Sequence, residues 1–129
     1  MKVFVDTSVW INYLNGSDTK KSATLAELIK SGQPIYSLPV VIQEIFQGFK
    51  HDKDIEACLD HLGALVFLKF EFLDAVEAAR MYRILRKRGI TAATIDLQIA
   101  SVCQRQGLHL LTNDRDFLAM SKILGLALV

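Results

Sequence analysis

The sequence predicts a single α/β domain of three layers, in which helices cover both faces of a mainly parallel sheet of four or five strands. Short runs of apolar, often β-branched residues alternate with segments whose apolar residues recur every three or four positions, a pattern typical of βαβ units. The 129 residues contain no repeat, linker or low-complexity stretch, and this length suits one domain over residues 1–129. Right-handed crossovers would then place the carboxyl ends of the parallel strands along one edge of the sheet.

Each expected element has a local signal. Short apolar runs bounded by turn-forming residues predict strands over residues 2–5, 35–37, 66–68 and 108–111, and residues 126–129 fit a fifth strand at the edge. The helical spacing of apolar residues predicts helices over 9–14, 22–31, 39–48, 55–62, 73–88, 94–106 and 117–123. Pro39 suits a first helical turn, Thr94 is expected to cap the helix that follows it, and Gly107 is expected to end that helix.

Composition sets limits on the class of protein. The net charge is +1, so the overall charge does not indicate a nucleic-acid partner, and 51% hydrophobic residues describe a globular chain. Cys58 and Cys103 lie far apart without the spacing of a zinc site or a disulfide framework. No apolar stretch approaches the roughly 18 residues of a membrane span. Because Asp6 follows Lys2 inside what would be the apolar part of a secretion signal, we expect a cytoplasmic protein.

Four acidic residues occupy positions that a carboxylate usually avoids. Asp6 ends the first apolar run, and Glu44 lies in the otherwise apolar first turns of the helix after the second strand. Asp96 stands between Ile95 and Leu97 at the start of a later helix, and Asp114 follows the last internal strand. An acid in such surroundings is rarely buried unless it is paired or bound to a cation.

Each of these acids also has an ordinary structural explanation. Asp6 and Asp96 suit helix caps or the first turn of a helix, where the helix dipole favours a negative charge. Asp114 suits an Asx turn after a strand. Glu44 has the weakest such explanation, which is a solvated stripe shared with Gln43 and Gln47.

Considered together, the acids favour a cation site. Carboxylates that converge at one sheet edge repel one another and raise their pKa values unless divalent cations neutralise them. Oxygen ligands without a partnering His or Cys motif suit Mg²⁺ or Mn²⁺ better than Zn²⁺. Two such ions can activate a water and stabilise the leaving oxygen of a phosphodiester.

The same residues resemble a known family. The chain contains Val-Asp-Thr-Ser-Val-Trp around Asp6, Glu44 in the helix after the second strand, Thr-Ile-Asp-Leu-Gln-Ile-Ala-Ser-Val around Asp96, and Leu-Leu-Thr-Asn-Asp-Arg-Asp-Phe around Asp114. The order and the local context of these acids resemble those of the PIN-domain nucleases, and more narrowly the VapC-type toxins of toxin–antitoxin pairs. The resemblance covers the whole chain.

The resemblance implies a PIN-like fold and an endoribonuclease that uses one or two Mg²⁺ or Mn²⁺ ions and a metal-activated water. Its acidic site would consist of Asp6, Glu44, Asp96 and Asp114, with Asp6, Asp96 and Asp114 as metal ligands and Glu44 holding a ligand or a water. Thr7 and Ser8 match the small hydroxyl residues that would orient Asp6. Asn113 and Asp116 would support the last acid, and Asp116 is a candidate to share its role.

A basic cluster is the candidate RNA-binding surface. Its residues crowd the end of one predicted helix: Arg80, Arg83, Arg86, Lys87 and Arg88. The ordinary explanation is a solvated face whose cations complement the carboxyl end of the helix. When the four site carboxylates are discounted, the rest of the chain carries +5, which would favour salt-dependent binding to an RNA backbone.

Aromatic residues and histidines are expected to serve the structure. Trp10, Tyr13, Phe46 and Phe49 follow helical spacing, which favours core or interface positions. The family resemblance suggests an antitoxin or a second copy of the chain, as a homodimer, as the partner on such a surface. His51, His61 and His109 share no ligand spacing, so each is expected in a surface or core role.

Three other functions are alternatives to the toxin. A PIN nuclease of RNA processing or decay would carry the same acids. A phospho-receiver domain, also a small α/β fold with magnesium, would need an acid pair after the first strand and a Lys after a late one, whereas Leu111 is followed by Thr-Asn-Asp. A catalytically idle binding module would not need the complete set of acids.

Overall fold

The computed structural model describes residues 1–60, 62 and 64–129. A parallel sheet of four strands has the order β3-β2-β1-β4, in agreement with the predicted fold class. The strands are β1 (Val3–Val5), β2 (Ile35–Ser37), β3 (Leu65–Phe67) and β4 (His109–Leu111). Seven helices accompany the sheet in the described part of the chain: α1 (Thr7–Leu14), α2 (Lys20–Lys30), α3 (Pro39–Gln47), α4 (Asp52–Leu59), α5 (Phe72–Lys87), α6 (Thr94–Gln106) and α7 (Arg115–Leu124).

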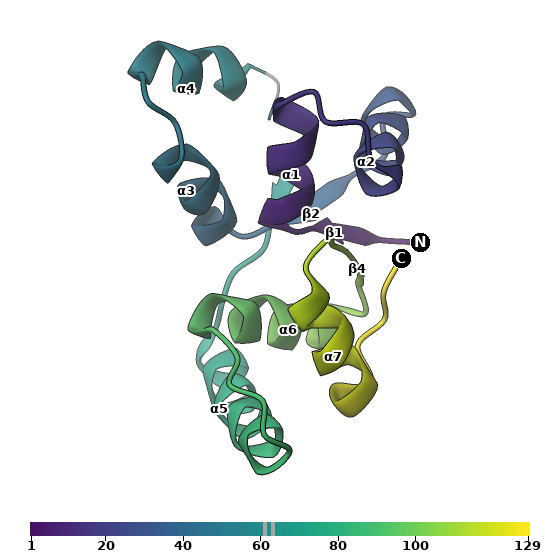
Figure 1. Cartoon of the computed structure of the whole chain (residues 1–129), viewed down its shortest axis with the longest axis vertical. Coiled ribbons are helices and arrows are strands. Elements are labelled where there is room, and N and C mark those ends of the chain that lie inside the picture. Colours follow the sequence, from purple (N-terminus) through teal and green to yellow (C-terminus); the bar gives the residue numbers. More distant parts are fainter. Residues whose placement is uncertain (61, 63) are drawn as a thin grey trace.

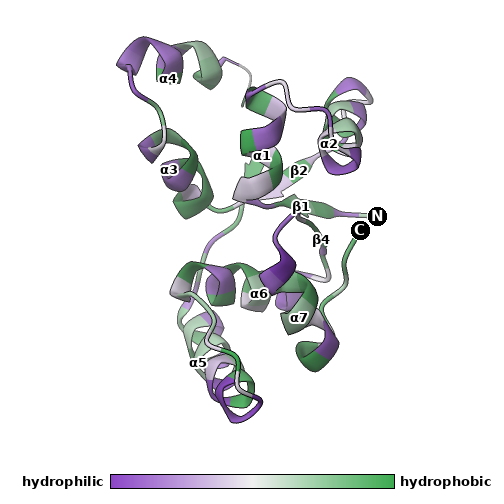
Figure 2. Cartoon of the chain, in the orientation of Figure 1, coloured by the Kyte–Doolittle hydropathy of each residue, from purple (hydrophilic) through white to green (hydrophobic). Residues whose placement is uncertain are grey.

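The helices lie on both sides of the sheet and form the outer two of three layers. Figure 1 shows α1 to α4 on one side of the strands and α5 to α7 on the other. Within these layers α1 packs against α2 and α3, and α5 packs mainly against α6. The core is built from the strands and the helix faces turned toward them, and Figure 2 shows β1 as mostly hydrophobic. Phe4 and Val5 are fully buried, as the uninterrupted apolar run of a central parallel strand predicts.

The order of the strands creates one topological switch point. The chain runs outward from β1 to β2 and β3, then crosses to the other face and returns as β4 on the opposite side of β1. In open α/β sheets ligands bind outside the carboxyl ends of the strands where the order reverses. The carboxyl ends of β1 and β4, followed at once by Asp6 and Thr112, therefore mark the expected site.

Several predicted boundaries need correction. Residues 66–68 were expected as a strand, but β3 is Leu65–Phe67. The predicted helix 55–62 is instead Asp52–Leu59, because Asp52 and Asp54 favour an earlier first turn. Thr94 does not cap α6, since it is already the first helical residue and Ala93 precedes it as the cap. The fifth strand is reduced to one bridge between Leu110 and Leu128.

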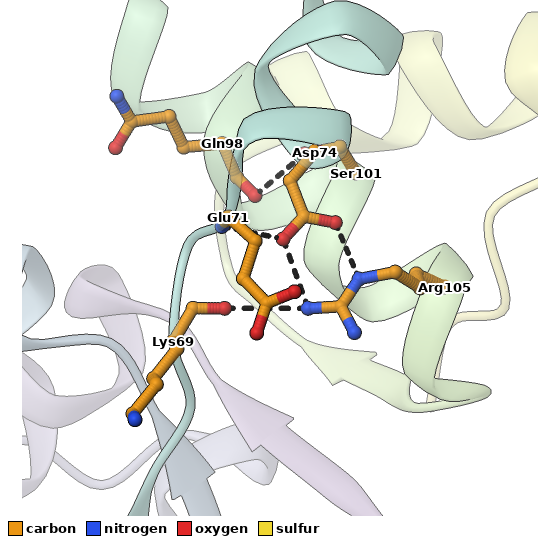
Figure 3. A network of polar contacts seen from close by, with 6 residues as sticks. All are labelled: Lys69, Glu71, Asp74, Gln98, Ser101 and Arg105. Atoms are coloured by element: carbon orange, nitrogen blue, oxygen red, sulfur yellow. Dashed lines mark hydrogen bonds and ion pairs between the residues drawn. The ribbon is translucent and has the colours of Figure 1, made fainter.

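An ion pair between the exposed Arg105 and the buried Asp74 links α6 to α5. Asp74 is 2% exposed and receives the guanidinium of Arg105, whose Nη2 donates to Asp74 Oδ2 at 2.9 Å and to the Lys69 carbonyl at 3.3 Å (Figure 3). The backbone N–H of Glu71 donates to the same Asp74 oxygen at 2.8 Å. Burial by itself would raise the pKa of Asp74, but Arg105 and the Glu71 N–H outweigh it and hold that pKa below its usual value. The pair thus fixes the helix that carries Asp96.

The structure also places the aromatic residues of the helices and the two cysteines. Trp10 is buried, and Tyr13, Phe46 and Phe49 pack against the core, so the structural explanation of these aromatics is confirmed. Cys58 and Cys103 are free thiols, as predicted. Among the described residues no helix is long and apolar enough to cross a membrane. His61 lies outside the described residues.

Candidate metal centre

Asp6 stands at the junction of β1 and α1. Its backbone N–H donates to the Leu111 carbonyl at 2.9 Å, which continues the pairing of β1 with β4. Asp6 has the extended conformation of an N-cap residue, yet its side chain makes no capping hydrogen bond to the helix. The residue is only 5% exposed. The cap explanation therefore accounts for the backbone of Asp6 and leaves its buried carboxylate unexplained.

Two hydroxyl groups hold that carboxylate. Ser8 Oγ donates to Asp6 Oδ2 at 2.9 Å, and Thr112 Oγ1 donates to the same oxygen at 2.8 Å. The sequence predicts this role for Ser8 but not for Thr112, although Thr112 lies in the Leu-Leu-Thr-Asn-Asp-Arg-Asp-Phe motif. Its partner lies 106 residues away in the sequence, so only the pairing of β1 with β4 brings the two together.

Glu44 on α3 is held by Thr7, the first residue of α1. Thr7 Oγ1 donates to Glu44 Oε1 at 2.9 Å, so the Thr7 hydroxyl orients Glu44 and not Asp6, which corrects the sequence expectation. Glu44 is half-buried, while Gln43 and Gln47 are exposed and hydrogen-bond to each other at 2.8 Å. The solvated stripe therefore exists, but Glu44 does not belong to it.

Three further carboxylates gather where α6 and α7 begin. Asp96, Asp114 and Asp116 each offer an oxygen within 4.8 Å of the others. Asp114 Oδ1 accepts the Asp116 N–H at 2.9 Å, so the Asx turn at this position is real and also brings Asp116 into the group. Asp116 is thus a member of the cluster, whereas the sequence predicts only a supporting role for it. The exposed Asn113 contributes its backbone N–H to Ser8 Oγ at 3.1 Å.

The electrostatics connect all these acids. Burial, as the largest cause, and the negative charges of four neighbouring carboxylates together raise the pKa of Asp96 to about 7. In order of their effect, these carboxylates are Asp6, Asp114, Glu44 and Asp116. Burial also raises the pKa of Asp6, and the hydrogen bonds from Thr112 and Ser8 oppose the rise. Asp96 therefore lies at the centre of a field of negative charge.

The donor set fits a hard divalent cation. The oxygens clustered with Asp96 come from the carboxylates of Asp114 and Asp116, and no His or Cys belongs to the described cluster. Cys103 is buried, and both its burial and the charge of Asp6 raise the pKa of its thiol, which disfavours a thiolate ligand. Mg²⁺ and Mn²⁺ prefer such oxygen ligands, and the charge of an ion would relieve the repulsion at Asp96.

The predicted basic cluster lies elsewhere on the molecule. Its members are exposed on the last turns of α5 and the residue that follows, and Figure 2 shows this end of the helix as hydrophilic. Arg80 pairs with Glu77 at 3.4 Å and Arg86 Nη1 donates to Thr91 at 3.0 Å. Arg83 and Lys87 make no ion pair within the described residues.

The chain therefore has an open, parallel α/β fold with a candidate metal centre at the carboxyl ends of β1 and β4. The model of the PIN domain matches residues 3–123. The chain therefore belongs to the PIN-domain family.

Solved structures with the same fold come from bacterial toxin–antitoxin systems. A structure of VapBC2 from Rickettsia felis bound to a promoter DNA fragment aligns with a TM-score of 0.80 at 20% identity, covering 100% of this chain and 98% of that one. The structure of VapBC-1 from nontypeable Haemophilus influenzae aligns with a TM-score of 0.77 at 18% identity, covering 100% of this chain and 97% of that one. Mycobacterium tuberculosis VapC20, a toxin that cleaves the sarcin–ricin loop, gives 0.71 at 20% identity, covering 99% and 98%. At these identities the likeness concerns the fold.

Proposed function

We propose that this chain is a Mg²⁺- or Mn²⁺-dependent endoribonuclease that hydrolyses RNA phosphodiester bonds. The observation that carries the proposal is the cluster of Asp96, Asp114 and Asp116, whose carboxylate oxygens lie within 4.8 Å of one another. Asp6 and Glu44 lie near enough for their charges to help raise the pKa of Asp96 to about 7. A structural cap or turn at any one position would not need the other four. Membership of the PIN family supports the same activity.

The chain's own side chains divide the work at such a centre. Asp6, Asp96 and Asp114 are the proposed ligands, and Asp116 joins them because it shares the cluster with two of them. Glu44 Oε1 is engaged by Thr7, so Oε2 is the oxygen available to hold a water. When bound at this site, a divalent cation would lower the pKa of a water and stabilise the negative charge that develops on the phosphate.

The proposed RNA contact is electrostatic. Arg83 and Lys87 carry exposed charges without an ion-pair partner among the described residues, and Arg80 and Arg86 lie on the same half of α5. These side chains would contact phosphates of the RNA backbone at a distance from the acids. Affinity for RNA should then fall steeply as the salt concentration rises.

We further propose that the nuclease is the toxin of a toxin–antitoxin pair acting in the cytoplasm. The likeness between the fold of this chain and the VapBC structures supports this role. A protein partner would also explain the exposed apolar side chains at the start of α5, where Phe72 is 80% and Leu73 is 71% exposed. An antitoxin and a second copy of the chain are the two partners proposed for this surface.

Expression in a bacterial host tests both proposals. The chain is induced with and without its neighbouring gene, and RNA 5′ ends are mapped before and after induction, with Asp96→Asn as the inactive control and Gln43→Ala as the matched control on α3. We expect new RNA ends and growth arrest from the wild type and from Gln43→Ala, suppressed by the neighbour and absent for Asp96→Asn.

The outcomes separate the alternatives. New RNA ends that the neighbouring gene leaves unchanged would support a PIN nuclease of RNA processing or decay and overturn the toxin role. The same RNA ends from Asp96→Asn, at equal expression, would overturn the assignment of the acidic site.

A further inference from the structure

The hydroxyl groups around the amino end of α1 serve different acids. Thr7 donates to Glu44, whereas Ser8 and Thr112 both donate to Oδ2 of Asp6, at 2.9 and 2.8 Å. Thr112 is 9% exposed and Asp6 is 5% exposed, so water competes little for the bond between them. One carboxylate oxygen of Asp6 therefore receives two short, shielded hydrogen bonds.

The direction of both hydroxyl protons is set by the loop between β4 and α7. Ser8 Oγ accepts the Asn113 N–H at 3.1 Å, and Thr112 Oγ1 accepts the Asp114 N–H at 2.9 Å. The two hydroxyl oxygens lie 3.5 Å apart, beyond the usual O–H···O range, so neither donates effectively to the other. Because a hydroxyl has one proton, each can donate it to Asp6 while its lone pair binds a loop amide.

We propose that Ser8 and Thr112 form a two-hydroxyl clamp that fixes the Asp6 carboxylate and leaves Oδ1 as the oxygen presented to a cation. The clamp rests on the proposed function, because it assigns positioning roles within the same site. Among the described residues no side chain donates a hydrogen bond to Oδ1. Ser8 and Thr112 are positioning residues, since they act through Asp6.

The clamp also couples Asp6 to the acids of α7. Thr112 joins the Asp6 carboxylate to the backbone of Asp114, whose own side chain turns the chain toward Asp116. Loss of either hydroxyl removes one of the two hydrogen bonds that hold the Asp6 carboxylate. It also removes one hydrogen bond to the backbone of the loop between β4 and α7. Loss of the second hydroxyl should then weaken cation binding less than the first did, so the two effects should not multiply.

A double-mutant cycle on Mn²⁺ binding tests the clamp without any RNA. The dissociation constant of Mn²⁺ is measured by electron paramagnetic resonance for the wild type, Ser8→Ala, Thr112→Val and the double variant. Thr112→Ser tests rescue because it keeps the hydroxyl. Ser101→Ala is the matched control, since it removes a buried hydroxyl that donates to the Gln98 carbonyl at 3.1 Å, away from Asp6. Circular dichroism checks that each variant is folded.

We expect Ser8→Ala and Thr112→Val each to bind Mn²⁺ about 10- to 100-fold more weakly, which is the usual effect of losing a hydrogen bond to a metal ligand. Thr112→Ser and Ser101→Ala should match the wild type within about threefold, and the double variant should lose less than the product of the single losses. Folded Ser8→Ala and Thr112→Val proteins with wild-type Mn²⁺ affinity would overturn the clamp and leave the proposed function standing. A wild type that bound no Mn²⁺ would overturn the proposed function and the clamp with it.

Discussion

The substitution Asp96→Asn should stabilise the metal-free chain at neutral and alkaline pH. Burial and four neighbouring carboxylates raise the pKa of Asp96 from 3.8 to about 7, so its ionised form is disfavoured in the folded state. A shift of this size corresponds to about 4 kcal/mol, and because the carboxyl is only partly buried and therefore screened by water we reduce this to about 2 kcal/mol. Asparagine keeps the shape and removes the charge, so it should recover most of that free energy.

The pH dependence gives the sign of the effect. The folded state holds the Asp96 proton more tightly than the unfolded state, so the penalty is absent below a pH of 3.8, grows as the pH rises, and is complete above about 7. Urea unfolding in EDTA at pH 5 and pH 8 measures it, with Asp18→Asn as an exposed control. The advantage of Asp96→Asn over the wild type should be larger at pH 8. If Asp96→Asn is no more stable than the wild type at pH 8, burial and the neighbouring carboxylates do not destabilise the ionised form of Asp96.

Three further predictions concern other parts of the molecule. Arg105→Ala should lower the urea midpoint clearly because it leaves a buried carboxylate without its cation, whereas loss of the exposed pair in Arg80→Ala should leave the midpoint unchanged. Gly107 ends α6 at a φ of +66°, so Gly107→Ala should cost about 1 kcal/mol in urea unfolding, whereas Gly48→Ala at a φ of −82° should change stability by less than about 0.5 kcal/mol. Arg83→Ala should weaken RNA binding in filter assays and reduce the slope of log affinity against log salt by about 0.7, and an unchanged slope would remove Arg83 from the RNA surface.

The parts predictable from the sequence are those set by local chemistry. The run Val-Phe-Val before Asp6 predicts a buried strand that ends in an acid, and the structure has β1 at Val3–Val5 with Asp6 directly after it. Pro39 begins α3 and Gly107 ends α6, as their fixed or left-handed backbone conformations predict. Parallel strands share one carboxyl edge, so acids far apart in sequence could be expected to meet there.

The rest depends on contacts that periodicity does not encode. The bond from Thr112 to Asp6 and the pair of Asp74 with Arg105 join residues 106 and 31 positions apart, and each needs the packed tertiary structure to exist. Asp116 joins the cluster because the Asx turn at Asp114 folds the chain back, a detail of loop geometry. The predicted start of α4 is wrong because the acidic residues Asp52 and Asp54 favour a first helical turn that lies before the apolar residues used to predict the helix.

Cleavage of RNA by the purified chain directly tests whether the acidic site is a metal-dependent ribonuclease centre. Labelled RNA is incubated with the wild type in Mg²⁺, in Mn²⁺ and in EDTA, beside Glu44→Gln and the α3 control Gln43→Ala. We expect cleavage by the wild type and Gln43→Ala with either ion, none in EDTA, and a rate at least about 100-fold lower for Glu44→Gln. Cleavage that persists in EDTA, or that Glu44→Gln carries out at the wild-type rate while folded, would contradict this expectation.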